Sequence, residues 1–255
     1  MNKTIAIITG ATGGIGKEFV TQLVNDHKVK EVWAVARNAE KLGALAEEFG
    51  SRVRTIKLDL TDEKAVGNFG SLLENEKPVI RFLINNAGAG QMGRSDELSA
   101  EDISKTIDLN CKAIALLCNI CIPFMKKGSR ILNVSSASSF QPTPYLNLYS
   151  ASKVFVRYYS RALNQELKKT GISVTAVCPG WVDTDMLPKE KNGKKINYPG
   201  LTTARHVVTM ALMDAMRKKE LSVCPVYSKF LHVYGKIMPQ KLIMRQWKYW
   251  IKDYI

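Results

Sequence analysis

Three side chains in the middle of the sequence have the types and spacing for proton transfer at an alcohol or carbonyl group. Tyr149 and Lys153 are four residues apart, so on a helix they would share one face. A nearby ammonium group favours the phenolate and lowers the pKa of a tyrosine. Such a phenol could protonate a carbonyl, while the hydroxyl of Ser136 hydrogen-bonds the same substrate oxygen. Each residue also has an ordinary interpretation, because Tyr149 and Lys153 could be a surface pair and Ser136 could simply end a strand.

A glycine-rich turn near the N-terminus suggests a place for the phosphates of a dinucleotide. The apolar run Thr4–Thr9 leads into residues 10–16, and an amphipathic segment follows. Glycines permit a sharp turn close to a pyrophosphate, and the N-terminus of the next helix offers free N–H groups and partial positive charge. Because the spacing differs from G-x-G-x-x-G, the turn alone would also fit a tight connection without a ligand. The cofactor contacts predicted here are Gly10, Thr12, Gly13, Gly14, Ile15 and Gly16.

The second apolar run favours a phosphorylated nucleotide. NAD sites usually carry a carboxylate at the end of this strand, where it binds the ribose 2′-hydroxyl. Here the run Glu31–Ala36 is followed by Arg37 and Asn38. The guanidinium of Arg37 could bind a 2′-phosphate, which predicts NADP(H) as the cofactor. The alternative is that Arg37 is only a solvated surface charge.

The elements that would position these residues alternate between short apolar runs and helix-length amphipathic segments. The continuously apolar, β-branched runs are typical of strands covered on both faces. Their alternation with helices predicts an α/β fold, a Rossmann-type doubly wound parallel sheet of about seven strands with helices on both faces. We expect one catalytic domain over residues 1–225 and a C-terminal helical extension over residues 226–255. The expected strands are Thr4–Thr9, Glu31–Ala36, Arg52–Leu58, Phe82–Asn85, Arg130–Ser135, Ser173–Cys178 and Leu221–Cys224, and expected helices include Ile15–Asn25, Ala39–Phe49 and Glu63–Glu74.

The composition is that of a globular protein with excess positive charge. The 255 residues are 45% hydrophobic and 24% charged, with a net charge of +14. From Met186 onward there are fourteen Lys and Arg against four Asp and Glu. This segment could attract acidic substrates, a phosphorylated cofactor or an anionic membrane, whereas its aromatic and basic residues form no recognisable nucleic-acid motif.

The number of cysteines and the N-terminal sequence indicate the cellular compartment of the protein. An odd number of cysteines without a secretory signal argues against a disulfide framework, and no apolar stretch approaches a membrane span, so a cytoplasmic location is expected. Cys118 and Cys121 form a C-x-x-C pair, but no second ligand pair follows. We therefore expect buried thiols and no metal site.

In order and spacing, these features resemble the short-chain dehydrogenase/reductase family over essentially residues 1–225. The Ala36-Arg37 pair is similar to the NADP-preferring branch of that family. No catalytic position departs from the family pattern, so the resemblance implies an active enzyme. It also implies a homodimer or homotetramer, formed through the helices of Asn110 and Tyr149. The matching motifs are Thr9-Gly10 with Gly14 and Gly16, Asp59-Leu60, Asn85 to Gly88, Asn110, Ser136, Tyr149 with Lys153, and Pro179-Gly180 with Thr184.

The resemblance implies a role for each matched residue. Asp59, with Leu60 beside it, would contact the adenine ring. Asn110 would bend its helix and hold a water that relays protons to Lys153. Lys153 would also bind the nicotinamide ribose, next to Tyr149. The residues that would line the rest of the cofactor are Asn86, Ala87, Gly88, Pro179, Gly180, Val182 and Thr184.

Bulky apolar residues predict a lipophilic substrate. In this fold ligands bind beyond the carboxyl ends of the strands, so the walls should come from residues 137–145 and from the segment after Thr184. Their character suits a steroid or an acyl chain, although such residues could also just pack the loops. The predicted substrate contacts are Ser136, Phe140, Tyr145, Tyr149, Trp181 and Met186.

The last part of the sequence predicts a basic amphipathic helix. Pro239 should mark a break, and from Gln240 apolar residues recur at helical spacing among Lys241, Arg245 and Lys248. Such a helix could close the substrate site, pack on a partner subunit or make peripheral membrane contact. Closing or packing is the preferred interpretation.

Three functions fit these patterns. The preferred one is an NADP(H)-dependent oxidoreductase that interconverts a secondary alcohol and a ketone on a small lipophilic substrate, like a hydroxysteroid dehydrogenase, with Tyr149 as acid and base. The second is a reductase of 3-oxoacyl thioesters of CoA or a carrier protein, whose phosphates suit the positive tail. The third is a non-catalytic protein that senses NADP, against which the intact Ser136, Tyr149 and Lys153 argue.

Overall fold

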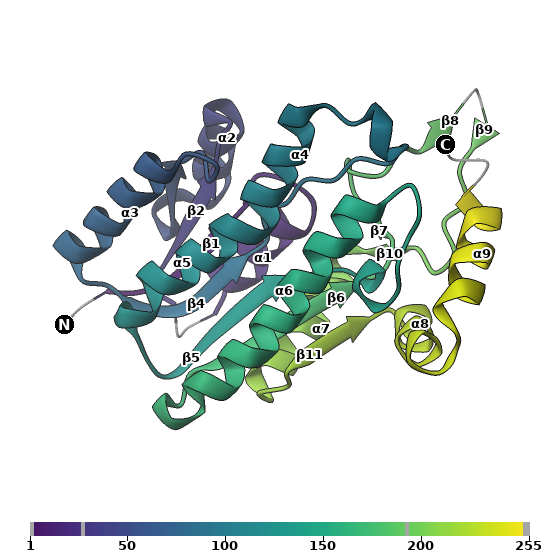
Figure 1. Ribbon diagram of the computed structural model, residues 1–255. Coiled ribbons are helices and arrows are strands. Elements are labelled where there is room, and N and C mark those ends of the chain that lie inside the picture. The colour runs from purple at the N-terminus through teal and green to yellow at the C-terminus, as the bar shows by residue number, and fades with distance from the viewer. Residues whose placement is uncertain (1–2, 27–28, 192–193, 252–255) are drawn as a thin grey trace.

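Seven parallel strands form the central layer of the molecule (Figure 1). The computed structural model describes residues 3–26, 29–191 and 194–251. The strand order is β11-β6-β5-β4-β1-β2-β3, so the sheet winds outward in both directions from β1 and β4. In such sheets the crevice beside the reversal point binds ligands. The strands are β1 (Thr4–Thr9), β2 (Glu31–Ala36), β3 (Val53–Lys57), β4 (Val79–Asn85), β5 (Met125–Val134), β6 (Ser173–Pro179) and β11 (Leu221–Cys224).

Helices cover both faces of the sheet, as Figure 1 shows. Helices α1, α2 and α7 contribute to one apolar cluster, and α3, α5 and α6 contribute to the other. The helices are α1 (Gly14–Val24), α2 (Ala39–Phe49), α3 (Glu63–Glu76), α4 (Ala100–Ile107), α5 (Ala113–Cys121), α6 (Asn147–Glu166), α7 (Ala204–Met216), α8 (Val226–Ile237) and α9 (Gln240–Ile251). The predicted doubly wound α/β architecture is therefore confirmed.

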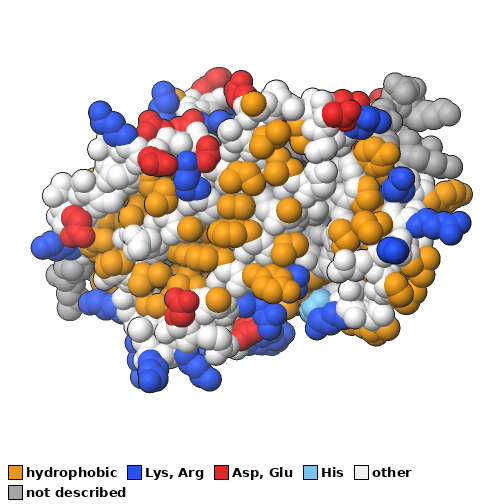
Figure 2. Space-filling model, viewed as in Figure 1, with side chains coloured by type: hydrophobic (Ala, Val, Ile, Leu, Met, Phe, Trp, Pro, Cys, Tyr) orange, Lys and Arg blue, Asp and Glu red, His pale blue; other side chains and the backbone are white. Residues whose placement is uncertain are grey.

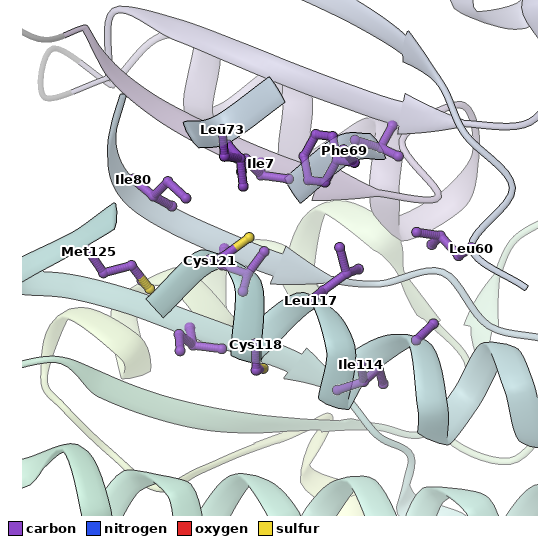
Figure 3. Close-up of a cluster of buried hydrophobic side chains, with 14 of the residues drawn as sticks. Ile7, Leu60, Phe69, Leu73, Ile80, Ile114, Leu117, Cys118, Cys121 and Met125 are labelled. Carbon is purple, nitrogen blue, oxygen red and sulfur yellow. The ribbon is translucent and has the colours of Figure 1, made fainter. Parts of the chain in front are cut away.

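The side chains of β1 supply both clusters in turn, because successive residues of a strand point to opposite faces. Ile5 and Ile7 join the cluster under α3 and α5, whereas Ala6 and Ile8 join the cluster under α1. Figure 3 shows Ile7 close to Phe69 and Leu73, with the α5 side chains on the other side of the cluster.

The thiols of the C-x-x-C pair belong to this core. Cys118 and Cys121 are fully buried on α5, as the sequence predicted (Figure 3). Burial raises the pKa of the Cys118 thiol to about 12, because a thiolate loses its hydration there. Both side chains therefore act as small apolar groups at neutral pH.

Most predicted strands and helices begin and end close to the residues that the sequence predicted. The strand Glu31–Ala36 and the helix Ala39–Phe49 agree residue for residue. The fifth strand begins at Met125 rather than Arg130, because Met125 pairs with Ile80 ahead of an irregularity in the ladder. The polar residues between Met125 and Arg130 hid this extension from the apolar pattern.

Helices α4 and α5 are joined by a π-helical turn over Asp108–Lys112. The resulting helical segment Ala100–Phe124 is long and apolar enough, by length and composition, to cross a membrane. In this fold α5 lies against the sheet and its inner face contributes Ile114 and Leu117 to the core.

Two helices complete the described chain. Helix α8 follows the edge strand β11, and α9 begins at Gln240, directly after the predicted break at Pro239. Trp247 on α9 donates from Nε1 to the carbonyl oxygen of Pro144 at 2.8 Å, which ties the helix to the loop after β5. Residues 252–255, the end of the predicted extension, lie outside the described residues.

Candidate active site

A cavity of about 910 Å³ lies at the carboxyl ends of β1, β4, β5 and β6. It joins segments that are far apart in the sequence: the glycine turn, the segment after β4, the α6 side chains and the loop after β6. Three of the four predicted catalytic residues line it, namely Ser136, Tyr149 and Lys153. The other predicted cofactor-binding residues that line it are Gly10, Thr12, Gly13, Gly14, Ile15, Asn86, Ala87, Gly88, Pro179, Gly180, Val182 and Thr184.

The glycine turn is folded against the end of β4. Gly10 and Gly14 have positive φ angles of 62° and 52°, which suit glycine. The side-chain amide of Asn86 donates to the carbonyl oxygens of Thr9 and Gly10, at 3.1 and 3.2 Å. Asn86 thus fixes the shape of the turn, in addition to lining the cavity.

The N-terminus of α1 has backbone N–H groups that no side chain caps, so they are available to bind an anion. Helices α2, α3, α4 and α7 each begin with a side chain that caps a backbone N–H group, whereas Gly13 gives α1 no side-chain cap. The first turn of α1 also carries no acidic residue. Free N–H groups facing a cavity lined by glycines fit the pyrophosphate of a dinucleotide.

Gly16 does not line the cavity but allows α1 to approach the turn. A Cβ atom there would lie 2.0 Å from the carbonyl oxygen of Gly10 and 2.6 Å from Nδ2 of Asn86. We therefore expect Gly16→Ala to lower the free energy of unfolding by about 1–3 kcal/mol, because rigid backbone must move. It should also weaken NADPH binding.

Urea unfolding and NADPH titration of the Gly16→Ala variant check this expectation. Gly67→Ala on α3 is the matched control, since its added methyl group meets nothing within 4 Å. That control should be neutral or stabilising by up to about 1 kcal/mol. Equal stabilities of the two variants would show that the close approach of Gly16 and Gly10 carries no energetic weight.

Helix α6 carries Tyr149 and Lys153 on one face, as predicted. The ammonium of Lys153 is 5.5 Å from the centre of the Tyr149 ring and donates to the carbonyl oxygen of Val134 at 2.9 Å. Ser136 follows β5 and lines the same cavity. A Cβ at Gly90 would lie 2.3 Å from the Tyr149 ring. The backbone of Gly90 therefore packs directly on the ring.

The electrostatics of the pair differ from the sequence prediction. Burial raises the pKa of Tyr149, and hydrogen bonding by Ser136 opposes that rise only in part. Burial also lowers the pKa of Lys153 to about 8. The expectation that the ammonium makes the phenol acidic is thus wrong for the protein alone, because desolvation penalises both charged forms.

Asn110 is buried behind the cavity rather than in its lining. Its Oδ1 accepts from the backbone N–H of Ala89 at 2.9 Å, and its Nδ2 donates to Ala89 O at 2.7 Å and to Ser152 Oγ at 2.9 Å. The π-helical turn around Asn110 agrees with the predicted bend of its helix. In this structure Asn110 connects the segment after β4 to α6 and so positions Gly90 and Tyr149.

Three residues expected at the adenine end lie outside the cavity lining. Leu60 is buried in the apolar core, and Asp59 Oδ1 accepts from the backbone N–H and hydroxyl of Thr61 at 2.9 and 2.8 Å. These hydrogen bonds are the main reason that the pKa of Asp59 is lowered, with a smaller contribution from the nearby charge of Arg37. Arg37 itself is exposed at the end of β2.

Lys41 lines the cavity and was missed by the sequence analysis. It stands in the first turn of α2, where the helix dipole disfavours a cation. Its place in the helix did not distinguish it in the sequence, because α3 and α7 also carry a cation in the first turn, Lys64 and Arg205, and neither lines the cavity.

More of the lining comes from the loop after β6 and the C-terminal helices. Trp181 and Met186 line the cavity as predicted, together with Tyr198, Leu231 and Trp247. The ring of Trp181 packs on Tyr198, with centroids 4.8 Å apart. Helices α8 and α9 thus contribute side chains to the wall of the cavity.

Two predicted substrate contacts are placed elsewhere. Phe140 is buried and stacks on His232 of α8, with ring centroids 4.4 Å apart. Tyr145 has a positive φ angle of 65°, its carbonyl oxygen accepts from the N–H of Gly93, and it does not line the cavity. Both residues shape the loop after β5, which their aromatic character alone could not reveal.

Comparison with known proteins places the chain in a family. The model of the short chain dehydrogenase family matches residues 4–195. A very-long-chain 3-oxoacyl-CoA reductase from Anas platyrhynchos is 35% identical over 192 residues, which cover 71% of this chain and 60% of that relative. This chain thus spans less than two thirds of that reductase.

Two solved structures match nearly the whole fold. A short-chain dehydrogenase from Sphingobium yanoikuyae, in complex with NADPH, is 28% identical with a TM-score of 0.77, covering 94% of this chain and 95% of the other. A bulky-bulky ketone specific alcohol dehydrogenase from Comamonas testosteroni is 26% identical with a TM-score of 0.72, covering 94% and 96%. Since the family model covers most of the sequence and the fold agrees throughout, this chain is an oxidoreductase of the short-chain dehydrogenase family.

Proposed function

We propose that this protein uses NADP(H) to interconvert a secondary alcohol and a ketone on a lipophilic substrate, in the manner of a hydroxysteroid dehydrogenase. The observation that carries the proposal is that Ser136, Tyr149 and Lys153 share one cavity with the glycine turn. The cavity is large enough for a bulky substrate, at about 910 Å³. The side chains of Trp181, Met186 and their neighbours give it an apolar lining.

Each residue of the site would have its own role in the transfer of hydride and proton. A bound nicotinamide would supply or accept the hydride. Tyr149 donates its hydroxyl proton to the carbonyl oxygen during reduction and takes it back during oxidation. Ser136 donates a hydrogen bond to the same oxygen and holds it against the phenol. Lys153 stabilises negative charge on Tyr149 as the proton leaves, and its bond to Val134 keeps it in place.

A substrate screen followed by NADPH absorbance tests this proposal. Hydroxysteroids and bulky ketones should turn over well, and small ketones poorly, because only bulky substrates fill the apolar part of the cavity. Turnover restricted to acetoacetyl-CoA and longer thioesters would instead identify a 3-oxoacyl-thioester reductase. That second candidate is supported by the similarity to the very-long-chain 3-oxoacyl-CoA reductase from Anas platyrhynchos. Tight NADPH binding without turnover of any ketone, alcohol or thioester would favour the sensing protein.

The preference for NADP(H) rests on two cations near the start of α2. Arg37 is exposed with no carboxylate beside it on β2, and Lys41 lines the cavity. Either could bind a 2′-phosphate. We expect Arg37→Asp and Lys41→Ala each to raise the KM for NADPH about ten- to a hundredfold, the range for one lost hydrogen bond to a charged group. The KM for NADH should fall or stay unchanged.

Initial rates with both cofactors check this expectation. Lys30→Asp, an exposed charge change at the opposite end of β2, is the matched control and should leave both KM values unchanged. An unaltered KM for NADPH in the Arg37 and Lys41 variants would show that neither residue reads the phosphate.

We also propose that the chain forms a homodimer or homotetramer through α4 and α6. The outer faces of these helices expose the apolar side chains of Ile103, Ile107, Phe155 and Tyr158. Figure 2 shows hydrophobic side chains gathered over this part of the surface. Since α4 and α6 carry or adjoin Asn110 and Tyr149, this is the face that the family resemblance implied.

A further inference from the structure

The outer face of α8 is apolar where a surface helix is usually polar. Val226, Phe230, Val233 and Ile237 follow one another at intervals of four, three and four residues, which places them on one face of the helix. Their side chains are 77%, 59%, 55% and 74% exposed. None of these residues lines the cavity or belongs to the buried core.

Helix α9 adds an exposed tryptophan and a row of cations. Its inner side is held by Ile243 and Ile251, which are buried, and by Trp247. Its outer side exposes Trp250, at 62%. Lys241, Arg245 and Lys248 recur at helical spacing and are exposed as well.

The charge of this surface has one sign. Between Val226 and Ile251 there are five Lys and Arg residues and no Asp or Glu. Lys229 and Lys236, both on α8, lie in sequence among the exposed apolar residues. Figure 2 shows hydrophobic and basic side chains interspersed over α8 and α9, with no acidic side chain among them. Exposed apolar groups rimmed by cations, with an exposed tryptophan, are typical of surfaces that lie in a membrane interface.

We propose that the outer faces of α8 and α9 form a docking surface for an anionic lipid bilayer. Val226, Phe230, Val233, Ile237 and Trp250 would enter the boundary between headgroups and acyl chains. The five cations would bind anionic headgroups, each contributing electrostatic attraction. A second copy of this chain is a poorer occupant, because a symmetric contact would bring the same cations of two subunits together.

The docking surface lies on the same two helices that close the cavity. Tyr227, Leu231 and Trp247 line the cavity from α8 and α9, so these helices would stand between the bilayer and the reacting groups. If the proposed function holds, a lipophilic substrate could reach the cavity from the bilayer without crossing water. The docking itself does not depend on that function.

Co-sedimentation with vesicles tests the proposal without any catalytic readout. The full chain should bind vesicles of phosphatidylcholine mixed with phosphatidylserine, and bind phosphatidylcholine alone weakly. A blue shift of tryptophan fluorescence should accompany binding as Trp250 leaves water. The double variant Val233→Gln/Ile237→Gln should lower the partition coefficient by at least about tenfold, because it removes apolar area that would be buried. Each of Lys229→Gln and Lys236→Gln should lower it about fivefold.

Matched controls separate docking from general changes of surface. Met213→Gln removes an exposed apolar side chain from α7, and Lys168→Gln removes an exposed charge beyond α6. Both should bind vesicles like the unmodified chain, and every variant should bind NADPH normally. Failure of the unmodified chain to bind anionic vesicles would overturn the proposal, as would equal binding by the α8 variants. Self-association without lipid that Val233→Gln/Ile237→Gln abolishes would overturn it in favour of a second copy.

Discussion

The Tyr149→Phe variant is expected to lose at least about a hundredfold in kcat, the range for removing a general acid and base. The substitution removes only the hydroxyl, so the ring can keep its packing against Gly90. NADPH binding should change little, because the glycine turn and the uncapped start of α1 are untouched. Steady-state rates with the best substrate of the screen, together with NADPH titration, check both parts.

Tyr158→Phe is the matched control for this loss. Tyr158 is exposed on the same helix, so its variant should keep full activity. Near-normal kcat in Tyr149→Phe would show that the proton comes from another group. Equal losses in both variants would indicate damage to α6 rather than lost acid–base chemistry.

Lys153→Met should abolish most activity and yet make the protein more stable at neutral pH. The folded-state pKa of Lys153 is about 8, against an ordinary value of 10.5, because burial disfavours the charged form. The folded state therefore holds a charge at a cost that is present in full below the folded pKa. Replacing the side chain with Met removes that cost, offset by the lost hydrogen bond to Val134. We expect a net gain of about 2 kcal/mol in the free energy of unfolding.

The stability advantage of Lys153→Met over the wild type should decrease as pH rises. As pH rises from about 8 toward 10.5, the folded state sheds the proton of Lys153 before the unfolded state does, so the wild-type chain gains stability relative to Lys153→Met. Tyr149 works in the opposite direction, but its pKa is raised above the ordinary value of 10, so its effect begins only beyond that value.

Urea unfolding of the two proteins at neutral pH and near pH 10 measures the difference. The advantage of Lys153→Met should shrink as pH rises. Lys168→Met, at an exposed position, should show no such trend. A Lys153→Met variant that is less stable than wild type at neutral pH would mean that the ammonium stabilises the fold.

The features that could be predicted from the sequence are those fixed by local spacing. Tyr149 and Lys153 meet because one helical turn separates them, and Gly10 to Gly16 turn because strand and helix must join there. The strands were visible because burial on both faces requires continuous apolar runs.

What escaped prediction depends on packing between distant segments. Phe140, in the segment after β5, is stacked by His232 of helix α8, which lies ninety-two residues further along the sequence. The direction of the Tyr149 pKa shift follows from how completely the phenol and Lys153 lose water, and spacing carries no information about that. Lys41 was missed because only the fold brings the first turn of α2 to the cavity, whereas the first-turn cations of α3 and α7 lie elsewhere.

The contact between Gly90 and Tyr149 limits how the specificity of this protein could be redesigned. The ring of Tyr149 fits here because residue 90 is a glycine and has no Cβ atom. Even a methyl group at residue 90 would occupy the volume that the ring fills. Engineering for other substrates must therefore treat this part of the cavity as fixed. The freedom to vary lies at Trp181, Met186 and the inner sides of the last two helices.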